Sequence, residues 1–189
     1  AETPLYDPMC GSGTLLCEAY LIATNTPPAF NRKHFGFERL PDFDNAVWQK
    51  VKKESIKNIK PLKPGLISGS DVSRDSVRAT LRNLDAISTN HRIQIKQMNM
   101  FDIKSLENKI IVTNPPYGIR LKSNVDLSGF YESIGDFLKQ KCKGSKAFIY
   151  FGERDYLKKI GLKATWKKPL QNGGLDGRLA KFEMYWYNY

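Results

Sequence analysis

Residues 4–16 read PLYDPMCGSGTLL, a short apolar run followed by a glycine-rich turn. Apolar residues then recur at helical spacing: Leu15, Leu16, Ala19, Tyr20 and Ala23. We therefore predict a strand over residues 4–7 and a helix from Thr14 to about Asn25, which Thr26-Pro27-Pro28 ends. Gly11 and Gly13 let the backbone take positive φ angles and approach a ligand closely. In a doubly wound sheet, nucleotide-like ligands bind at this first turn between strand and helix.

The same alternation of strand and helix continues along the chain. It predicts strands over 66–70, 93–98, 109–113 and 146–151, and helices over 74–87 and 130–141. Residues 26–65 are aromatic, basic and proline-containing, and indicate an insertion or lid with a helix around 46–59. At the C-terminus, strands over 162–170 and 179–187 have only turn residues between them, which predicts an antiparallel hairpin. The fold class is therefore α/β, with a mostly parallel sheet covered by helices on both faces.

The composition limits the possible partners and locations. The 189 residues include 30 Lys and Arg against 19 Asp and Glu, a net charge of +11. This excess indicates a nucleic acid partner, with a solvated basic surface as the alternative. No stretch approaches the roughly 18–20 apolar residues that span a membrane, and the N-terminus lacks a signal-peptide pattern. Because the chain starts directly before a strand and without a methionine, we expect a fragment of a longer protein.

The cysteines give a further indication of the environment. Cys10, Cys17 and Cys142 fit no zinc-binding spacing, so we expect no metal site. An odd number of cysteines favours a reducing compartment, and therefore a soluble, cytoplasmic protein.

Polar residues also follow the second and third predicted strands. Asp71 can accept two hydrogen bonds from a ribose diol, although an acid at the start of the next helix is an equal alternative. In the stretch 99–102, Asp102 can accept from the amino group of an adenine, and Met100 or Phe101 can pack on its ring. The alternative for this stretch is a polar loop with one buried aromatic residue.

The most specific motif is Asn114-Pro115-Pro116-Tyr117, directly after the strand predicted over 109–113. Two prolines force the chain to leave the sheet, and an asparagine before proline is held extended. Since proline has no backbone N–H, Asn114 Oδ1 and the Pro115 carbonyl oxygen can accept both hydrogens of an exocyclic amine. Tyr117 can stack on a flat base. A turn that was only rigid would need neither Asn114 nor Tyr117.

These motifs, in this order at consecutive strand ends, resemble the class I S-adenosylmethionine-dependent amino-methyltransferases. Longer stretches are similar to the RNA methyltransferases that carry a THUMP domain: residues 7–15 (DPMCGSGTL), the aromatic residues of 35–48, residues 114–121 (NPPYGIRL) and residues 172–179 (NGGLDGRL). Among these, the chain is most similar to the bacterial enzymes that methylate N2 of a guanosine in 23S ribosomal RNA.

The resemblance implies a Rossmann-like class I methyltransferase fold, with a seven-stranded, mostly parallel sheet and an antiparallel C-terminal hairpin. It implies that residues 1–189 form the catalytic domain, with the insertion or lid at about 26–65. An N-terminal RNA-binding domain and a further cofactor-site segment would then lie outside this chain. The expected cofactor is S-adenosyl-L-methionine, and the expected partner is ribosomal RNA.

The resemblance also implies roles for individual residues. The residues expected to bind the cofactor are Asp7, Met9, Cys10, Gly11, Gly13, Thr14, Asp71 at the ribose, Phe101 and Asp102 at the adenine, and Asn114. The residues expected to be catalytic are Asn114, Pro115, Pro116 and Tyr117, and those expected to bind the substrate are Tyr117 and Arg120.

The expected chemistry is direct methyl transfer to a neutral exocyclic amine. Hydrogen bonds to Asn114 and Pro115 would favour a more pyramidal nitrogen as positive charge develops, and alignment of donor and acceptor would supply much of the rest. No strong base is required, because the proton can leave after transfer, so neither His34 nor His91 is assigned a role.

Several alternatives share part of this pattern. Adenine-N6 transfer to DNA or RNA and glutamine-N5 transfer to a protein use the same Asn-Pro-Pro-Tyr motif, although Gly118-x-Arg120-Leu121 and the charge favour RNA. A non-catalytic nucleic-acid-binding module on this fold is disfavoured by the intact Asp71, Asp102 and Asn114. An NAD-dependent dehydrogenase is disfavoured because Leu16 stands where the dinucleotide-binding turn requires glycine.

Overall fold

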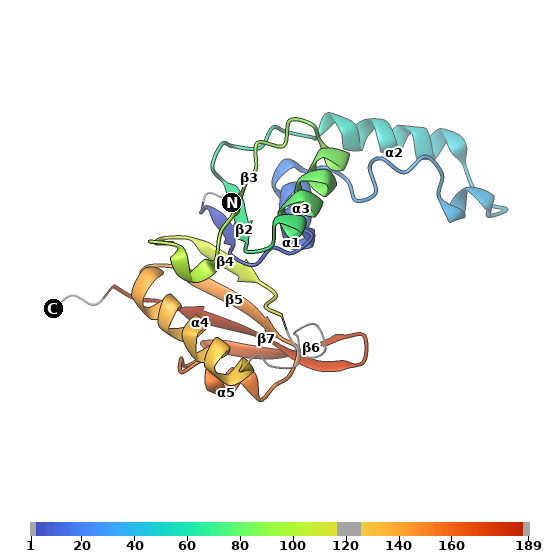
Figure 1. The fold of residues 1–189 in the computed structure, drawn as a ribbon. Helices are drawn as coiled ribbons and strands as arrows, with labels where there is room; N and C mark the ends of the chain where they lie inside the picture. The colour runs from blue at the N-terminus through green and yellow to red at the C-terminus, as the bar shows by residue number, and fades with distance from the viewer. Residues whose placement is uncertain (1–2, 117–125, 187–189) are drawn as a thin grey trace.

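The computed structural model describes residues 3–116 and 126–186, and within them a seven-stranded sheet in the order β3-β2-β1-β4-β5-β7-β6 (Figure 1). The strands are β1 (Leu5–Asp7), β2 (Ile67–Asp71), β3 (Gln94–Gln97), β4 (Ile110–Thr113), β5 (Lys146–Phe151), β6 (Trp166–Asn172) and β7 (Leu175–Glu183). The first five pair in parallel, whereas β7 is antiparallel to both β5 and β6. The predicted α/β class, with its antiparallel C-terminal hairpin, is confirmed.

The helices other than α2 form two layers, one on each face of the sheet (Figure 1). The helices are α1 (Thr14–Thr24), α2 (Asn45–Lys57), α3 (Arg74–Ile87), α4 (Leu127–Lys141) and α5 (Tyr156–Lys159), with 3-10 turns η1 (Gly36–Arg39) and η2 (Met100–Asp102). Helices α1 and α3 cover β1 to β3 on one face, and α4 and α5 cover β4, β5 and β7 on the other.

Strand register explains why these two layers lie on opposite faces. Leu5 of β1 pairs with Ile67 and Ile110, and Tyr6 pairs with Ile111, so paired residues share a face. Leu5 and Ile67 pack in the apolar cluster under α1 and α3, whereas Tyr6 and Ile111 pack in the cluster under α4. Because successive side chains point to opposite faces, β1 contributes to both clusters.

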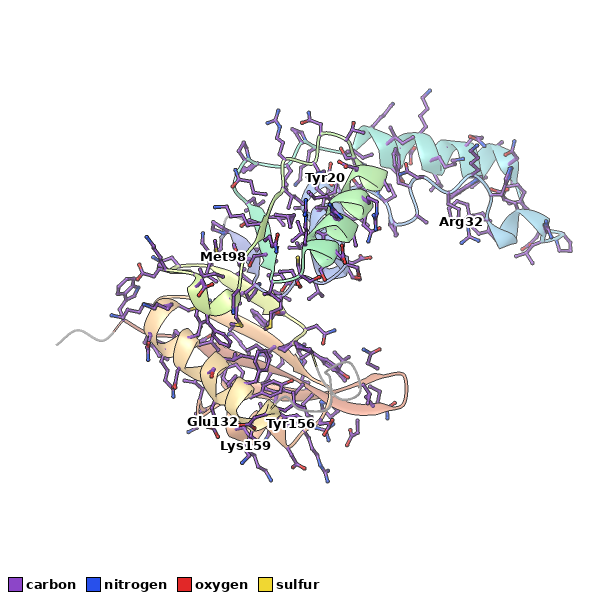
Figure 2. The ribbon with its side chains drawn as sticks, viewed as in Figure 1. Tyr20, Arg32, Met98, Glu132, Tyr156 and Lys159 are labelled. Carbon is purple, nitrogen blue, oxygen red and sulfur yellow. The ribbon has the colours of Figure 1, made fainter. Side chains whose placement is uncertain are left out.

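Residues 26–60 form an arm that projects from the end of α1 away from the sheet (Figure 1). Its base is held by hydrogen bonds from the Thr26 N–H to the Leu21 carbonyl (2.9 Å) and from the Lys60 N–H to the Thr24 carbonyl (2.8 Å). Helix α2 lies within the arm and has no buried residue. Figure 2 shows Arg32 on this arm, far from Tyr156 and Lys159 at α5. We refer to residues 26–60 as the arm.

The structure corrects one expectation about the C-terminal part and adds one helix to it. Strand β7 begins at Leu175 rather than Leu179, because Asn172 pairs with Leu175 across a turn of only two residues. Gly177 therefore lies inside the strand, where the ring of Tyr150 occupies the space that a Cβ atom would need. The short helix α5 was not predicted. No helix in the described part of the chain is long and apolar enough to cross a membrane.

Candidate active site

The glycine-rich turn follows β1 and is held by bonds to its neighbours. Asp7, the last residue of β1, is buried and accepts a hydrogen bond from the Met9 N–H at 3.1 Å. The Cys10 N–H donates to the Ser70 carbonyl at the end of β2 (3.0 Å). Gly11 and Gly13 adopt φ angles of 55° and 84°, in the left-handed region that favours glycine. The turn therefore requires glycine at both positions, as predicted.

Thr80 of α3 supports the turn from behind, and the sequence did not single it out. Its hydroxyl donates to the Gly11 carbonyl at 2.8 Å and lies 3.6 Å from the Cys10 Sγ. A Cβ atom on Gly13 would lie only 2.6 Å from the Thr80 Cγ2. The signal that could have indicated it is a polar residue on the inner side of an amphipathic helix. Thr80 fixes the turn's shape through packing and one hydrogen bond.

Asp71 links the turn after β1 to the turn after β2. Its Oδ2 accepts from the Gly11 N–H and its Oδ1 accepts from the Ser73 N–H, both at 2.9 Å. An ionised carboxylate has about four acceptor positions, so two remain for a ligand. Asp71 is therefore fixed in orientation and still able to accept from a diol.

A cleft with a volume of about 720 Å³ opens at the carboxyl ends of β1, β2, β3 and β4. Its lining residues are Pro8, Met9, Gly11, Asp71, Val72, Ser73, Ser76, Asn99, Met100, Phe101, Asn114, Pro115, Pro116 and Phe130. A cleft at this edge, where the strand order reverses from β1 to β4, is the usual ligand site of an open α/β sheet. The volume lies in the range of pockets that hold small molecules and cofactors.

The predicted cofactor residues divide into those that line this cleft and those behind it. Those on the cleft wall are Met9, Gly11, Asp71, Phe101 and Asn114. Asp7, Cys10 and Gly13 are buried, and Thr14 begins α1 at the surface; none of them borders the cleft. We infer that this second group holds the turn in shape.

Asp102 is not among the residues that line the cleft, and its predicted role at the adenine stays a prediction. It borders a separate depression with Tyr6, Ser68 and Lys96, on the face of β1 to β3 opposite α1 and α3. The next residue, Ile103, is buried in the cluster under α4 and draws the chain to that face.

Asn99 is the polar residue after β3 that lines the cleft. It lies two residues after the end of β3 and borders the cleft beside Phe101. Its Oδ1 accepts from the Phe101 N–H at 3.1 Å, and its Nδ2 has no partner among the described residues. Its short distance from the strand end is the sequence signal that could have indicated Asn99.

Asn114 lies directly after β4, between two cavities. On one side it borders the cleft together with Pro115 and Pro116. On the other it borders an apolar cavity of about 690 Å³, on the sheet face that carries α1, which Gln171 at the end of β6 also lines. Its exposed amide can therefore meet two ligands that approach from different sides. Tyr117 and Arg120 lie outside the described residues.

Burial changes the pKa values of two groups behind the turn. It raises the pKa of Asp7 to about 7, and the charge of Asp71 acts in the same direction, while the Met9 N–H opposes it. Burial raises the pKa of the Cys10 thiol to about 12. Cys10 is therefore neutral and unreactive near neutral pH, and serves as a packing residue.

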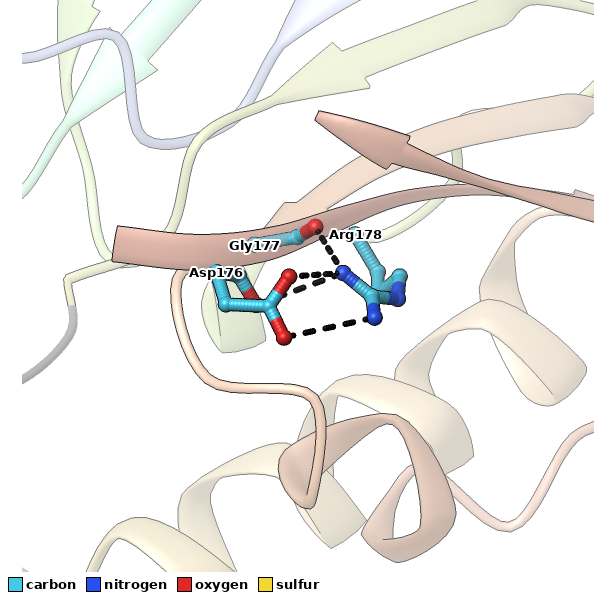
Figure 3. A network of polar contacts seen from close by, with 3 residues as sticks. All are labelled: Asp176, Gly177 and Arg178. Carbon is cyan, nitrogen blue, oxygen red and sulfur yellow. Dashed lines mark hydrogen bonds and ion pairs between the residues drawn. The ribbon is translucent and has the colours of Figure 1, made fainter. Parts of the chain in front are cut away.

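The β6–β7 hairpin reaches the same edge of the sheet. Figure 3 shows Arg178 of β7 folded back on its own strand, where it donates to the Gly177 carbonyl (2.8 Å) and pairs with the carboxylate of Asp176. The hydrogen bond from Arg178 lowers the pKa of Asp176. Gln171 of the same hairpin lines the apolar cavity that Asn114 also borders.

The chain matches the family model of the RMKL-like methyltransferase domain over residues 1–181. The chain belongs to this family. The predicted family resemblance is thereby confirmed, whereas the association with a THUMP domain stays a prediction.

Individual relatives agree with the family match. A ribosomal RNA large subunit methyltransferase K/L from Allochromatium vinosum is 32% identical over 185 residues, covering 95% of this chain and 25% of that protein. A Synechocystis protein, slr0064, provisionally named an RNA methyltransferase, is 36% identical over 185 residues, covering 97% of this chain and 48% of that protein. The chain thus spans half or less of the length of these relatives.

A solved structure of similar fold holds a cofactor product. The structure of SMU.472, provisionally named a methyltransferase and solved in complex with SAH, has a TM-score of 0.86 and 31% identity. The match covers 99% of this chain and 49% of that one. These findings support S-adenosyl-L-methionine as the cofactor, as the sequence predicts.

Proposed function

We propose that this domain transfers a methyl group from S-adenosyl-L-methionine to an exocyclic amine of a base in RNA, and specifically to N2 of a guanine in 23S ribosomal RNA. The observation that carries the proposal is the position of Asn114. Its amide borders the cleft that also contains Gly11, Asp71 and Phe101, and it borders a second cavity from which a base can approach.

The residues of the cleft fit the proposed cofactor. The remaining acceptor positions of Asp71 suit the two hydroxyls of a ribose, and the exposed ring of Phe101 suits the face of an adenine. Asn99, with its unpaired Nδ2 and its Oδ1, can both donate to and accept from the adenine edge. We assign this role to Asn99 instead of Asp102. The bound cofactor would supply an electrophilic methyl group.

The chain's own residues would position the acceptor amine. Asn114 Oδ1 and the Pro115 carbonyl oxygen would accept its two hydrogens, which orients the nitrogen lone pair toward the methyl group. These acceptors interact more strongly as the nitrogen becomes positive, so they stabilise the transition state more than the ground state. Tyr117 would stack on the base. The proton leaves after transfer, so no general base is assigned.

Replacing Asn114 tests this mechanism. In Asn114→Ala, methyl transfer to ribosomal RNA should fall by at least about 100-fold, because one positioned catalytic contact contributes roughly that much. The dissociation constant for S-adenosyl-L-methionine, measured by calorimetry, should change by less than about threefold. Asn90→Ala, an exposed asparagine remote from the cleft, is the matched control. Unchanged turnover in Asn114→Ala would remove the role assigned here.

The methylated nucleoside decides which base is the substrate. After incubation with the wild-type protein, the RNA is digested and analysed by mass spectrometry. We expect it to contain N2-methylguanosine. N6-methyladenosine in its place would support the adenine-N6 alternative, which uses the same Asn114 geometry.

We also propose that a part of the protein outside this chain contributes to RNA binding in the cytoplasm. Support comes from the lengths of the relatives, since the chain covers 25% of the Allochromatium protein and 48% of the Synechocystis protein. Compared with this chain, a longer form of the protein should then have a lower KM for RNA and the same affinity for S-adenosyl-L-methionine.

A further inference from the structure

A row of lysines on α2 has no partner in the described part of the chain. Lys50, Lys53 and Lys57 are three and four residues apart, so they lie on one side of the helix. All three are exposed, and none forms an ion pair with a described residue. We refer to these three residues as the lysine ridge. Lys60 and Lys63 follow along the chain and are also exposed.

Helix α2, which carries the lysine ridge, is held by a side-chain cap and by aromatic packing. The side chain of Asp44 caps α2 by accepting from the Ala46 N–H (2.8 Å) and the Val47 N–H (3.1 Å). On the side of α2 away from the ridge, the Trp48 ring packs edge-on against Phe35 and Phe37, with centroid distances of 5.4 and 4.9 Å. The ridge is therefore presented in a fixed position, which lowers the ordering entropy lost on binding.

The charges of α2 are unbalanced, with four lysines against the single acid Glu54. Glu54 lies beside the ridge but forms no ion pair with a described residue. Since like charges on one side of a helix repel each other, this arrangement disfavours the isolated helix. A polyanion would convert that repulsion into attraction.

We propose that the lysine ridge binds the phosphate backbone of the substrate RNA, at a contact site separate from the cleft. The inference rests on the proposed function, because the cleft is what identifies RNA as the polyanion. Lys50 and Lys57 are seven residues apart, or about 10 Å along the helix axis, which matches about three nucleotides of a strand. Lysine recognises phosphate as a point charge, so this contact would add affinity without reading sequence.

The position of the arm makes the contact depend on RNA length. Helix α1 begins directly after the glycine-rich turn beside the cleft and ends at the arm with Thr24, so about 15 Å of helix separates the turn from the base of the arm. In Figure 1 the arm and the β6–β7 hairpin project toward the same side of the molecule. A long or folded RNA can thus reach both sites, whereas a strand of about 4 nucleotides held in the cleft cannot reach the ridge.

Salt dependence of binding tests the lysine ridge. The triple variant Lys50→Gln/Lys53→Gln/Lys57→Gln is compared with the wild-type chain, using a labelled fragment of 23S ribosomal RNA of about 60 nucleotides. The slope of log Kd against log salt concentration should fall in magnitude by about 2–3, since each lost phosphate contact removes about 0.7–0.9. The affinity for SAH should be unchanged, which also verifies that the variant is folded.

The control removes the same charge elsewhere. The variant Lys141→Gln/Lys143→Gln/Lys146→Gln changes three exposed lysines around the start of β5, at the amino ends of the parallel strands, opposite the cleft. It should keep the wild-type slope, and an RNA of about 4 nucleotides should bind both variants and wild type equally.

If the slope of log Kd against log salt concentration is the same for the two triple variants, the proposal is wrong. This is the result expected if the arm binds a protein instead of RNA. Binding is measured without methyl transfer, so the outcome is independent of the Asn114→Ala test. If the ridge variant binds RNA like the wild type, only the role of the lysine ridge is wrong, and the proposed role of the cleft is unaffected. If RNA binds but is never methylated, only the proposed activity is wrong.

Discussion

Asp7 shows how one residue can stabilise a site while reducing the stability of the fold. Its carboxyl group is buried behind the glycine-rich turn, and the pKa of Asp7 is raised to about 7. In the unfolded chain the pKa is near 4. Between these two pH values the folded state binds more protons than the unfolded state, so the free energy of unfolding falls as the pH rises from about 4 to about 7.

Asp7→Asn should remove this loss of folding stability at higher pH, because the amide stays neutral at every pH. At pH 8 the variant is expected to be more stable than the wild type by up to about 4 kcal/mol, and near pH 4 the advantage should vanish. Urea unfolding at the two pH values measures the difference. A wild-type-to-variant difference that is the same at pH 4 and pH 8 would contradict the burial effect assigned to Asp7.

Asn99 and Asp102 offer a second comparison at the level of single residues. Only Asn99 borders the cleft, although the sequence favoured Asp102. We expect Asn99→Ala to weaken S-adenosyl-L-methionine binding by about 5–10-fold, the value of one net hydrogen bond. Asp102→Ala should change it by less than about twofold. Calorimetry on both variants decides the assignment, and the reverse order of effects would restore Asp102.

Between elements, the packing of α3 against the first turn is the contact that shapes the cleft. The Thr80 hydroxyl donates to the Gly11 carbonyl, and the Asn83 amide donates to the Ser12 carbonyl, both at 2.8 Å. Gly13 fits only because it has no Cβ atom. The turn and the helix therefore behave as one unit.

Gly13→Ala should lower the free energy of unfolding by about 2–4 kcal/mol, from the positive φ angle and from overpacking against Thr80. In a Thr80→Ala background the added loss should shrink to the φ contribution of about 1–2 kcal/mol. Gly36→Ala is the control, since a Cβ atom there meets nothing within 4 Å and φ is not positive. Denaturant unfolding measures all four variants. Strict additivity of Gly13→Ala and Thr80→Ala would show that the two residues do not interact.

The elements that sequence reasoning predicted well are those with a clear local period. Helix α3, predicted over 74–87, occupies Arg74–Ile87, since Ser73 caps it directly before its first residue and the apolar spacing is local to the segment. The start of β7 was wrong because the strand pairing, not the local glycine content, sets where the hairpin turns. The position of Asp102 outside the cleft lining could not be predicted for a related reason, because the direction of the chain after β3 depends on the burial of Ile103 under α4.

For the whole molecule, the sheet carries one apolar cluster on each face, and residues beside both clusters line the cleft. One cluster packs under α1 and α3, and the other packs under α4. Wall residues come from both halves, with Gly11 and Asp71 on one side and Asn114 and Phe130 on the other. A ligand in the cleft therefore bridges the two halves and stabilises both.

This bridging predicts a ligand-dependent rise in melting temperature. At about 100 times its dissociation constant, SAH should add about 2.7 kcal/mol to the free energy of unfolding. For a chain of this size, that corresponds to an increase in Tm of about 5–10 °C. NAD at the same concentration should leave Tm unchanged, because Leu16 replaces the glycine that a dinucleotide turn requires. Thermal unfolding followed by fluorescence gives both values. An absent SAH shift would favour the non-catalytic module, since a domain that merely retains the fold has no reason to bind the cofactor at this cleft.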